Sequence, residues 1–308
     1  MWQWFAKLKS RSKLEHFYLP LANNNQVKLF VKRDDLIDPY ISGNKLRKLE
    51  GNLKAAKNAG AQQLLTFGGA YSNHLLASAA AAKERKIPIA GWVRGEELKA
   101  QSNDLLTQCQ QLGMDLNFID RTLFKEAKHQ SGLHTIDQKA TWVIPEGGAN
   151  PEGILGCTEI YTEAVAQNNE QHFDAVFIAQ GTTTTSLGLL ASIPSSTKLF
   201  VVPVLKGFDA ISEMQALAQK AKQNPTTAHL EFPFSQVRVL DTHHHGGYAK
   251  TTPELIDFIK TFNDTQQFPI EPTYTGKALL ALQTEAPQLR GKKVLFVHTG
   301  GIQTFGKH

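Results

Sequence analysis

Cysteine is scarce in this chain, which has only Cys109 and Cys157 among its 308 residues. No spaced set of Cys and His residues suggests a structural zinc site, and two isolated thiols favour a reducing compartment. Long apolar runs are also missing. No stretch approaches the roughly 18 apolar residues of a membrane span, and the N-terminal segment lacks the continuous apolar core of a secretory signal. We therefore expect a cytoplasmic protein that does not enter a membrane.

A strong excess of charge of one sign is absent as well. The 33 Lys and Arg residues against 28 Asp and Glu leave a net charge of +5, and the basic residues are scattered. A nucleic-acid-binding groove usually shows clustered basic residues with interleaved aromatics, so we expect no nucleic-acid partner. No GxGxxG follows the first predicted strands, which disfavours a dinucleotide-binding oxidoreductase.

The chain does contain short apolar runs that alternate with longer amphipathic segments, a pattern typical of α/β proteins with parallel sheets covered by helices. The predicted strands are Val27–Lys32, Leu64–Phe67, Ile89–Val93, Asp115–Ile119, Thr141–Ile144, Ala175–Ala179, Leu199–Val204, Val237–Leu240 and Val294–His298. The predicted helices are Lys45–Asn58, Ser72–Arg85, Ser102–Leu112, Glu152–Gln167, Thr183–Ala191, Ala210–Lys222, Pro253–Asn263 and Lys277–Thr284. So many strands favour two α/β domains over one wide sheet.

The first candidate for chemistry is Lys45, which follows the motif KRDDL and is the third residue of the run GNKLRKLE. It lies near a predicted helix N-terminus, where the helix dipole disfavours an ammonium and lowers its pKa. An amine that must form a Schiff base needs that lowering. The alternative is that Lys45, Arg47 and Lys48 form a solvated helical face.

A second cluster is FGGAYSNH, in which an apolar strand runs into two glycines and then into Ser72, Asn73 and His74. Glycines let the backbone approach a ligand, and a helix N-terminus offers free N–H groups to a carboxylate. Ser72 or Asn73 could instead serve as a simple N-cap.

The third cluster is a glycine followed by a run of hydroxyl side chains between a strand and a helix, which predicts a phosphate cradle. The cluster consists of Gln180, Gly181, Thr182, Thr183, Thr184, Thr185 and Ser186, and the cradle is expected from the glycine and the hydroxyls. It lacks the lysine of a nucleotide P-loop, and a Thr-rich turn without a ligand is the alternative. Three adjacent imidazoles, His243 to His245, would point to alternate faces of a strand, so we expect no metal site there.

In their order along the chain, KRDDL, GNKLRKLE, GGAYSNH, EGGAN, the Thr-rich loop and a closing HTGG resemble one family. It contains D-cysteine desulfhydrases and 1-aminocyclopropane-1-carboxylate (ACC) deaminases, within the tryptophan-synthase-β-like pyridoxal-phosphate enzymes of fold type II. The likeness runs from about Val27 to Gly301. It implies parallel-rich sheets in two α/β domains, with the cofactor in the cleft between them. We expect a smaller domain at residues 52–160 and a larger one from residues 1–51 and 161–308.

The resemblance also assigns roles. Lys45 matches the lysine that carries pyridoxal 5′-phosphate and moves the Cα proton, and Asn73 matches the residue that bonds the cofactor's 3′ oxygen. Ser72 matches a catalytic serine near the substrate carboxylate. The loop from Gly181 matches the phosphate cradle, and Thr299 matches the residue that faces the pyridine nitrogen.

Within the family, Tyr248 and Tyr274 match two active-site tyrosines that flank the substrate, and His74 lies in the substrate-binding motif. The deaminases carry Glu after the second tyrosine and Leu in the closing motif, where this chain has Thr275 and Thr299. Both choices resemble the desulfhydrases. We therefore expect a lyase that converts D-cysteine to pyruvate, ammonia and sulfide, and a homodimer by resemblance. The alternatives are ACC deamination, racemisation or elimination on D-serine, and a phosphate-ligand-binding protein without turnover.

Overall fold

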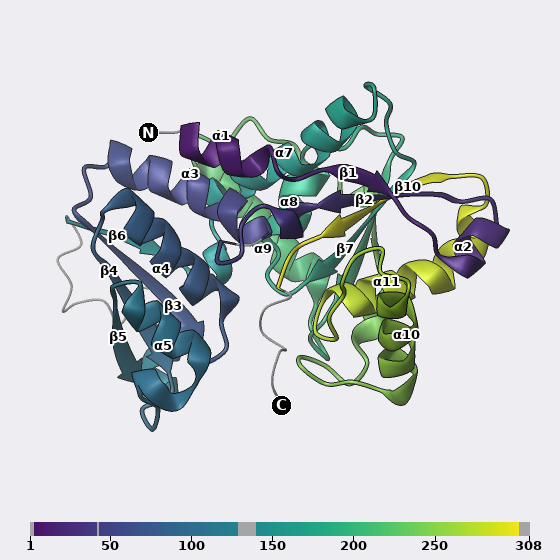
Figure 1. The fold of residues 1–308 in the computed structure, drawn as a ribbon. Coiled ribbons are helices and arrows are strands. Elements are labelled where there is room, and N and C mark those ends of the chain that lie inside the picture. The colour runs from purple at the N-terminus through teal and green to yellow at the C-terminus, as the bar shows by residue number, and fades with distance from the viewer. Residues whose placement is uncertain (1–2, 42, 129–139, 302–308) are drawn as a thin grey trace.

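The computed structural model describes residues 3–41, 43–128 and 140–301, which form two sheets with helices around them (Figure 1). The larger sheet has the order β1 (Leu14–His16), β2 (Lys28–Arg33), β10 (Lys293–His298), β7 (Ala175–Gln180), β8 (Lys198–Pro203) and β9 (Val237–Val239). The smaller has the order β5 (Met114–Ile119), β4 (Ile89–Arg94), β3 (Gln63–Gly69) and β6 (Thr141–Ile144). The pairing of β1 with β2 is antiparallel, and the other pairings are parallel.

Helices connect the strands, and in Figure 1 helices α3, α7 and α8 lie between the two sheets. The helices are α1 (Gln3–Lys9), α2 (Pro20–Asn24), α3 (Asn44–Asn58), α4 (Asn73–Arg85), α5 (Asp104–Gln111), α6 (Arg121–Lys128), α7 (Pro151–Gln167), α8 (Thr184–Leu190), α9 (Ala210–Gln223), α10 (Pro253–Asp264) and α11 (Thr275–Glu285). No helix in the described ranges combines the length and the apolar character that crossing a membrane requires.

Each predicted strand and helix has a counterpart in the structure, within two residues at either end. The elements that the sequence analysis missed are β1, α1, α2 and α6, which contain 3, 7, 5 and 8 residues. Elements this short carry too few apolar positions for their periodicity to be recognised.

The larger sheet is buried on both faces, which explains the uninterrupted apolar sequence of its central strand β7. Val176 and Ile178 belong to the core cluster that includes residues of α7, α8 and α9. Phe177 and Ala179 belong to the cluster on the opposite face, with residues of α10 and α11. The two faces of β7 therefore contact different sets of helices.

The smaller sheet has its own core, and residues from the start of the chain contribute to it. Phe5, Leu8, Leu46 and Leu49 share this cluster with residues of α4 and of the strands β3 and β4. The segment before residue 52 thus packs partly on the smaller sheet. The domain boundaries drawn from the sequence at residues 52 and 160 stay a prediction.

The larger sheet opens at its carboxyl edge between β7 and β10. Their pairing covers only Val294–Phe296 of β10, although both strands continue beyond it. By contrast, β10 pairs with β2 as far as His298, and β7 pairs with β8 as far as Gln180. A crevice beyond the carboxyl ends of parallel strands is where α/β sheets bind ligands.

Candidate active site

Lys45 lies in the first turn of α3, at a point where the chain meets the end of β10. Gly43, just before the helix, has a positive φ of 62°, and a Cβ there would lie 1.8 Å from the carbonyl oxygen of Thr299. Only glycine fits this close approach. The structure therefore brings the turn just before Lys45 against Thr299, a predicted site residue that is far away in the sequence.

The Lys45 amine is set up to be neutral near physiological pH. Its Nζ donates to Oδ1 of Asn44 at 2.8 Å, and the Asn44 amide donates in turn to Oγ1 of Thr185 at 2.9 Å. Burial, and to a smaller extent the charge of Lys48, lower the pKa of Lys45 to about 7. The sequence predicted the lowered pKa from the helix dipole, whereas burial is its main cause.

Lys48 is a second buried cation, which the sequence analysis did not place in the site. Only 1% of its surface is exposed, and its Nζ donates to Oγ1 of Thr182 at 3.0 Å and to the carbonyl of Gly147 at 3.2 Å. Burial lowers its pKa to about 8. Since Arg47 is buried as well, the alternative of a solvated helical face is wrong.

Arg47 belongs to a buried ion cluster that holds α3 in place. Its guanidinium binds both oxygens of Asp34, at 2.6 and 2.7 Å, and both oxygens of Glu163, at 2.9 and 2.7 Å. Lys32 binds Glu163 at 2.9 Å, and the hydroxyl of Ser12 donates to Asp34 at 2.6 Å. The charged residues of KRDDL at positions 32 and 34 thus anchor the helix that carries Lys45.

The predicted phosphate cradle lies beside these lysines. Besides the bonds of Thr182 and Thr185, the hydroxyl of Thr184 donates to the carbonyl of Gly148 at 3.3 Å. Thr183 precedes α8 and makes no side-chain capping bond. A Cβ on Gly181 would lie 3.0 Å from the Tyr274 ring, so glycine leaves room for that ring.

The motif SNH opens α4 at the end of the smaller sheet. Ser72 occupies the N-cap position, but its side chain makes no capping hydrogen bond. A simple capping role therefore does not account for this hydroxyl. The amide nitrogen of Asn73 is 3.5 Å from the position of a Cβ on Gly301, so Asn73 faces the closing glycines of the HTGG motif.

His74 is buried and held as a neutral imidazole. Thr66 donates its hydroxyl hydrogen to the Ile144 carbonyl at 2.9 Å and is 2.8 Å from Nε2 of His74, which assigns the ring proton to Nε2. Burial lowers the pKa of His74 well below its usual value, and Lys45 and Lys48 lower it further. His74 therefore lies close to both ammonium groups without competing with them for a proton.

Tyr248 and Tyr274 meet edge to face on the larger-sheet side, with ring centroids 6.1 Å apart. Burial raises the pKa of Tyr274 well above its usual value, and the charge and hydrogen bond of Tyr248 raise it further. The Glu271 carboxylate accepts the backbone N–H groups of residues 273, 274 and 275 at 2.6 to 2.8 Å, which fixes Tyr274. Glu271 was not predicted, and a single acidic residue before a helix gave too weak a signal.

The three imidazoles at residues 243–245 bind separate neighbours. Nδ1 of His244 accepts the Gly246 N–H at 3.0 Å, and Nδ1 of His245 is 3.0 Å from the Thr252 hydroxyl. Within the described part of the chain, no group of three or more His, Cys, Asp or Glu residues could hold a metal ion.

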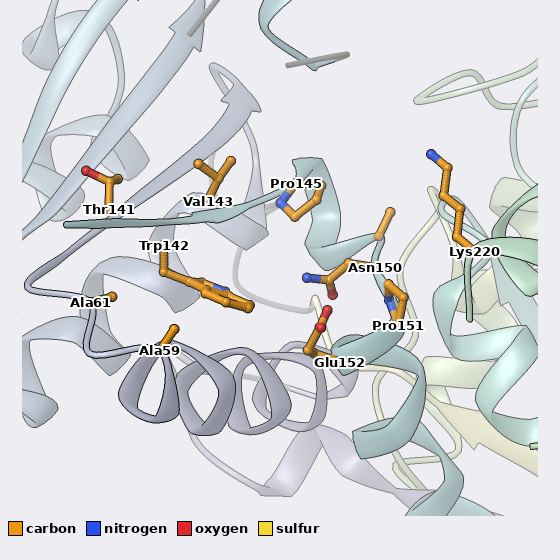
Figure 2. A pocket seen from close by; sticks show the side chains of 11 residues that line it. Ala59, Ala61, Thr141, Trp142, Val143, Pro145, Asn150, Pro151, Glu152 and Lys220 are labelled. Carbon is orange, nitrogen blue, oxygen red and sulfur yellow. The ribbon is translucent and has the colours of Figure 1, made fainter. Parts of the chain in front are cut away.

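A cavity of about 470 Å³ lies between β6, the residues that follow α3, the start of α7 and Lys220 of α9. Figure 2 shows the Trp142 ring above the end of α3, with Glu152 on one side and Lys220 across the opening. No residue predicted to bind cofactor or substrate lines it. The candidate active site is therefore the cluster around Lys45, and this cavity is separate from it.

Comparisons with known proteins show which proteins the chain is similar to. Residues 16–300 match the family described as pyridoxal-phosphate dependent enzymes. A Pyrococcus abyssi protein provisionally named an ACC deaminase is 31% identical over 297 residues, which cover 92% of this chain and 88% of that protein. A D-cysteine desulfhydrase of Yersinia pestis is 28% identical over 289 residues, which cover 89% and 86%.

Solved structures confirm the expected fold. The crystal structure of an ACC deaminase homologue has a TM-score of 0.81 and 26% identity, and the match covers 98% of this chain and 95% of that one. A hydrogen sulfide-producing enzyme from Fusobacterium nucleatum has a TM-score of 0.68 at 12% identity, with 98% of each chain covered. At that identity the second match supports the fold alone.

Proposed function

Because this chain belongs to the family of pyridoxal-phosphate-dependent enzymes, we propose that it eliminates the β-substituent of a small D-amino acid, with D-cysteine as substrate. D-Cysteine and water would give pyruvate, ammonia and hydrogen sulfide. Relatives named as an ACC deaminase and as a D-cysteine desulfhydrase support a reaction of this class.

The observation that carries the proposal is the Lys45 amine. Its pKa of about 7 leaves a large fraction neutral at physiological pH, and a lysine needs that form to react with the aldehyde of the cofactor. No Asp or Glu among the described residues contributes to this pKa. Lys45 would hold the cofactor covalently and, once released by substrate, would take the proton from Cα.

The neighbouring residues fit the rest of the cofactor. Lys48 and the loop 181–186 would hold the phosphate, since a buried ammonium with no carboxylate partner and a set of hydroxyls suit an anion. Asn73 would bind the 3′ oxygen, and Thr299 would face the pyridine nitrogen. When bound, pyridoxal phosphate delocalises the negative charge left at Cα.

The substrate would lie between the two tyrosines and the SNH motif. Ser72 would contact its carboxylate, and His74 would contribute as a neutral group. Because Tyr274 keeps its proton at neutral pH, its hydroxyl can donate a hydrogen bond and pass a proton to the departing group.

Thr275 favours the desulfhydrase over the deaminase. The deaminase resemblance calls for a carboxylate at this position, directly after Tyr274. Here the Thr275 hydroxyl is buried and bonded within the start of α11, where it accepts the Glu271 N–H at 3.0 Å. ACC deamination is the second candidate, because the Pyrococcus abyssi relative at 31% identity carries that name.

Absorbance of purified protein tests the proposal, with wild type beside Lys45→Ala. Wild type should show a visible cofactor band that the variant lacks, and D-cysteine should shift the band and release pyruvate and sulfide. Release of 2-oxobutanoate from ACC in place of this would favour the deaminase. A Lys45-dependent band that no amino acid perturbs would indicate a binding protein without turnover. No Lys45-dependent band after reconstitution would refute the cofactor site itself.

We also propose that the protein acts as a cytoplasmic homodimer. Both cysteines are unpaired and buried, as suits a reducing compartment. The dimer rests on the family resemblance, and light scattering of the purified protein would test it.

A further inference from the structure

Gln180 is a buried amide without a hydrogen-bond partner. It is the last residue of β7 and is 0% exposed. Neither its Oε1 nor its Nε2 bonds any other group among the residues that the structure describes. A glutamine amide can donate two hydrogen bonds and accept two, and this one makes none.

Leaving a buried amide unpaired is costly, and folded proteins avoid it. Burial of an amide without a partner destabilises a folded protein, so each unpaired buried amide in a native protein needs an explanation. Gln236, another buried glutamine, shows the usual solution: its Nε2 donates to the carbonyls of Pro194 at 2.6 Å and Thr197 at 2.7 Å. The contrast suggests that the partner of Gln180 comes from outside the chain.

The position of Gln180 in the fold indicates which ligand would supply the missing hydrogen-bond partner. Along β7, side chains alternate between faces, and Gln180 falls on the same face as Val176 and Ile178, which is covered by α7 and α8. Asn44 and Thr185 join α3 to α8 there. Gln180 also ends β7 where the sheet opens toward β10, directly before the Gly181 loop.

A second unpaired group belongs to the same segment of the chain. The Ser186 hydroxyl in α8 is 0% exposed and has no partner among the described residues. The segment from β7 into α8 therefore contains two buried polar side chains with unused bonding capacity. Both belong to the elements that would hold the cofactor.

We propose that Gln180 is a further cofactor-binding residue, whose amide donates a hydrogen bond to a polar group of bound pyridoxal phosphate. The inference rests on the proposed location of the cofactor. The phosphate oxygens and the pyridine nitrogen are both acceptors, which matches the Nε2 donor. The unpaired amide therefore destabilises the cofactor-free protein, and binding of the cofactor would remove this destabilisation.

The test compares Gln180→Leu with wild type and with the control Gln236→Leu, each with cofactor and after its removal. Melting temperatures are recorded for both forms, and the dissociation constant for pyridoxal phosphate is measured by titration. Gln180→Leu should leave the cofactor-free protein as stable as wild type or more so, because the variant removes an unpaired amide. Its dissociation constant should rise about tenfold, which corresponds to about 1.4 kcal/mol.

The control separates cofactor binding from a structural role. Gln236→Leu should lower the melting temperature of both forms equally and leave the dissociation constant unchanged. If Gln180→Leu behaves like the control, the inference is wrong. Gln180→Met, with a more flexible side chain, supplies the same comparison if the leucine variant does not fold. Failure of wild type to bind pyridoxal phosphate would overturn the proposed function, whereas equal binding by wild type and Gln180→Leu would overturn only this inference.

Discussion

Helix α3 carries buried cations in two different electrostatic environments. Burial opposes the charge of Arg47, but the Asp34 and Glu163 carboxylates together outweigh it, and the pKa of the guanidinium lies well above its ordinary value. One residue further along the helix, burial lowers the pKa of Lys48 to about 8, and no Asp or Glu of the described residues opposes it. Lys45, one turn earlier, behaves like Lys48.

The difference distinguishes Arg47, which holds the helix in place, from Lys45 and Lys48, which are proposed to bind the ligand. A buried cation is tolerated when an anion compensates its lost hydration. At Arg47 the fold supplies that anion through Asp34 and Glu163. At Lys48 the compensation would come from the phosphate of the cofactor. Methionine substitutions at the three positions test this division, because methionine keeps most of the side-chain length and removes the charge.

Lys45→Met should have the largest effect, which falls on turnover and on covalent attachment of the cofactor and not on the stability of the cofactor-free protein. We expect the release of pyruvate from D-cysteine to fall on the order of 10³-fold or more, because the Cα proton then has no base. The free energy of unfolding of the cofactor-free protein should not decrease, since no carboxylate of the described residues pairs with Lys45. Steady-state kinetics and urea denaturation measure the two quantities. Full turnover in this variant would contradict the assignment of Lys45.

Arg47→Met should act in the opposite way, on stability. Removing the guanidinium leaves Asp34 buried without its main partner, which costs about 3–5 kcal/mol in comparable ion pairs. The double variant Arg47→Met with Asp34→Asn should be less destabilised than the sum of the single variants, because the buried charge is then gone as well. Additive losses in urea denaturation would show that the two side chains do not interact as the distances indicate.

Lys48→Met should weaken cofactor binding without destabilising the empty protein. We expect a rise of about tenfold in the dissociation constant for pyridoxal phosphate, from the loss of one charge-assisted hydrogen bond. The melting temperature of the cofactor-free form should stay the same or increase. If the variant binds the cofactor as tightly as wild type, the phosphate does not lie at Lys48.

Helix α3 also shows how much of the site could be predicted from the sequence. Local patterns predicted the strands other than β1 and most helices, and they singled out Lys45 as a candidate, because apolar runs and the Gly-Asn-Lys turn each lie within a few residues. The role of Lys48 depends on Gly147 and Thr182, which are 99 and 134 residues away in the sequence. Glu163, which pairs with Arg47, is 116 residues away.

Glu271 was missed, and the burial of the Gln180 amide was not foreseen, for a related reason. A glutamine that ends an apolar strand resembles many surface residues until the structure shows it buried and unpaired. Glu271 acquires its role only when the backbone turns to direct three N–H groups at its carboxylate. Burial and partner identity are properties of the fold, and a single sequence does not reveal them.

The pH dependence of stability should show the smallest effect. It gives the most direct test of the difference between Arg47 and Lys48. The pKa of Lys48 is lowered from 10.5 to about 8 in the folded protein. Between these values the unfolded chain binds the proton more tightly, so stability rises with pH. From pH 8 to pH 9 the cofactor-free wild type should gain about 1 kcal/mol relative to Lys48→Met. Urea denaturation at the two pH values measures the difference.

With cofactor bound, the phosphate charge should stabilise the Lys48 ammonium, and the gain in stability from pH 8 to pH 9 should shrink. An equal gain in both forms would mean that the phosphate does not lie near Lys48.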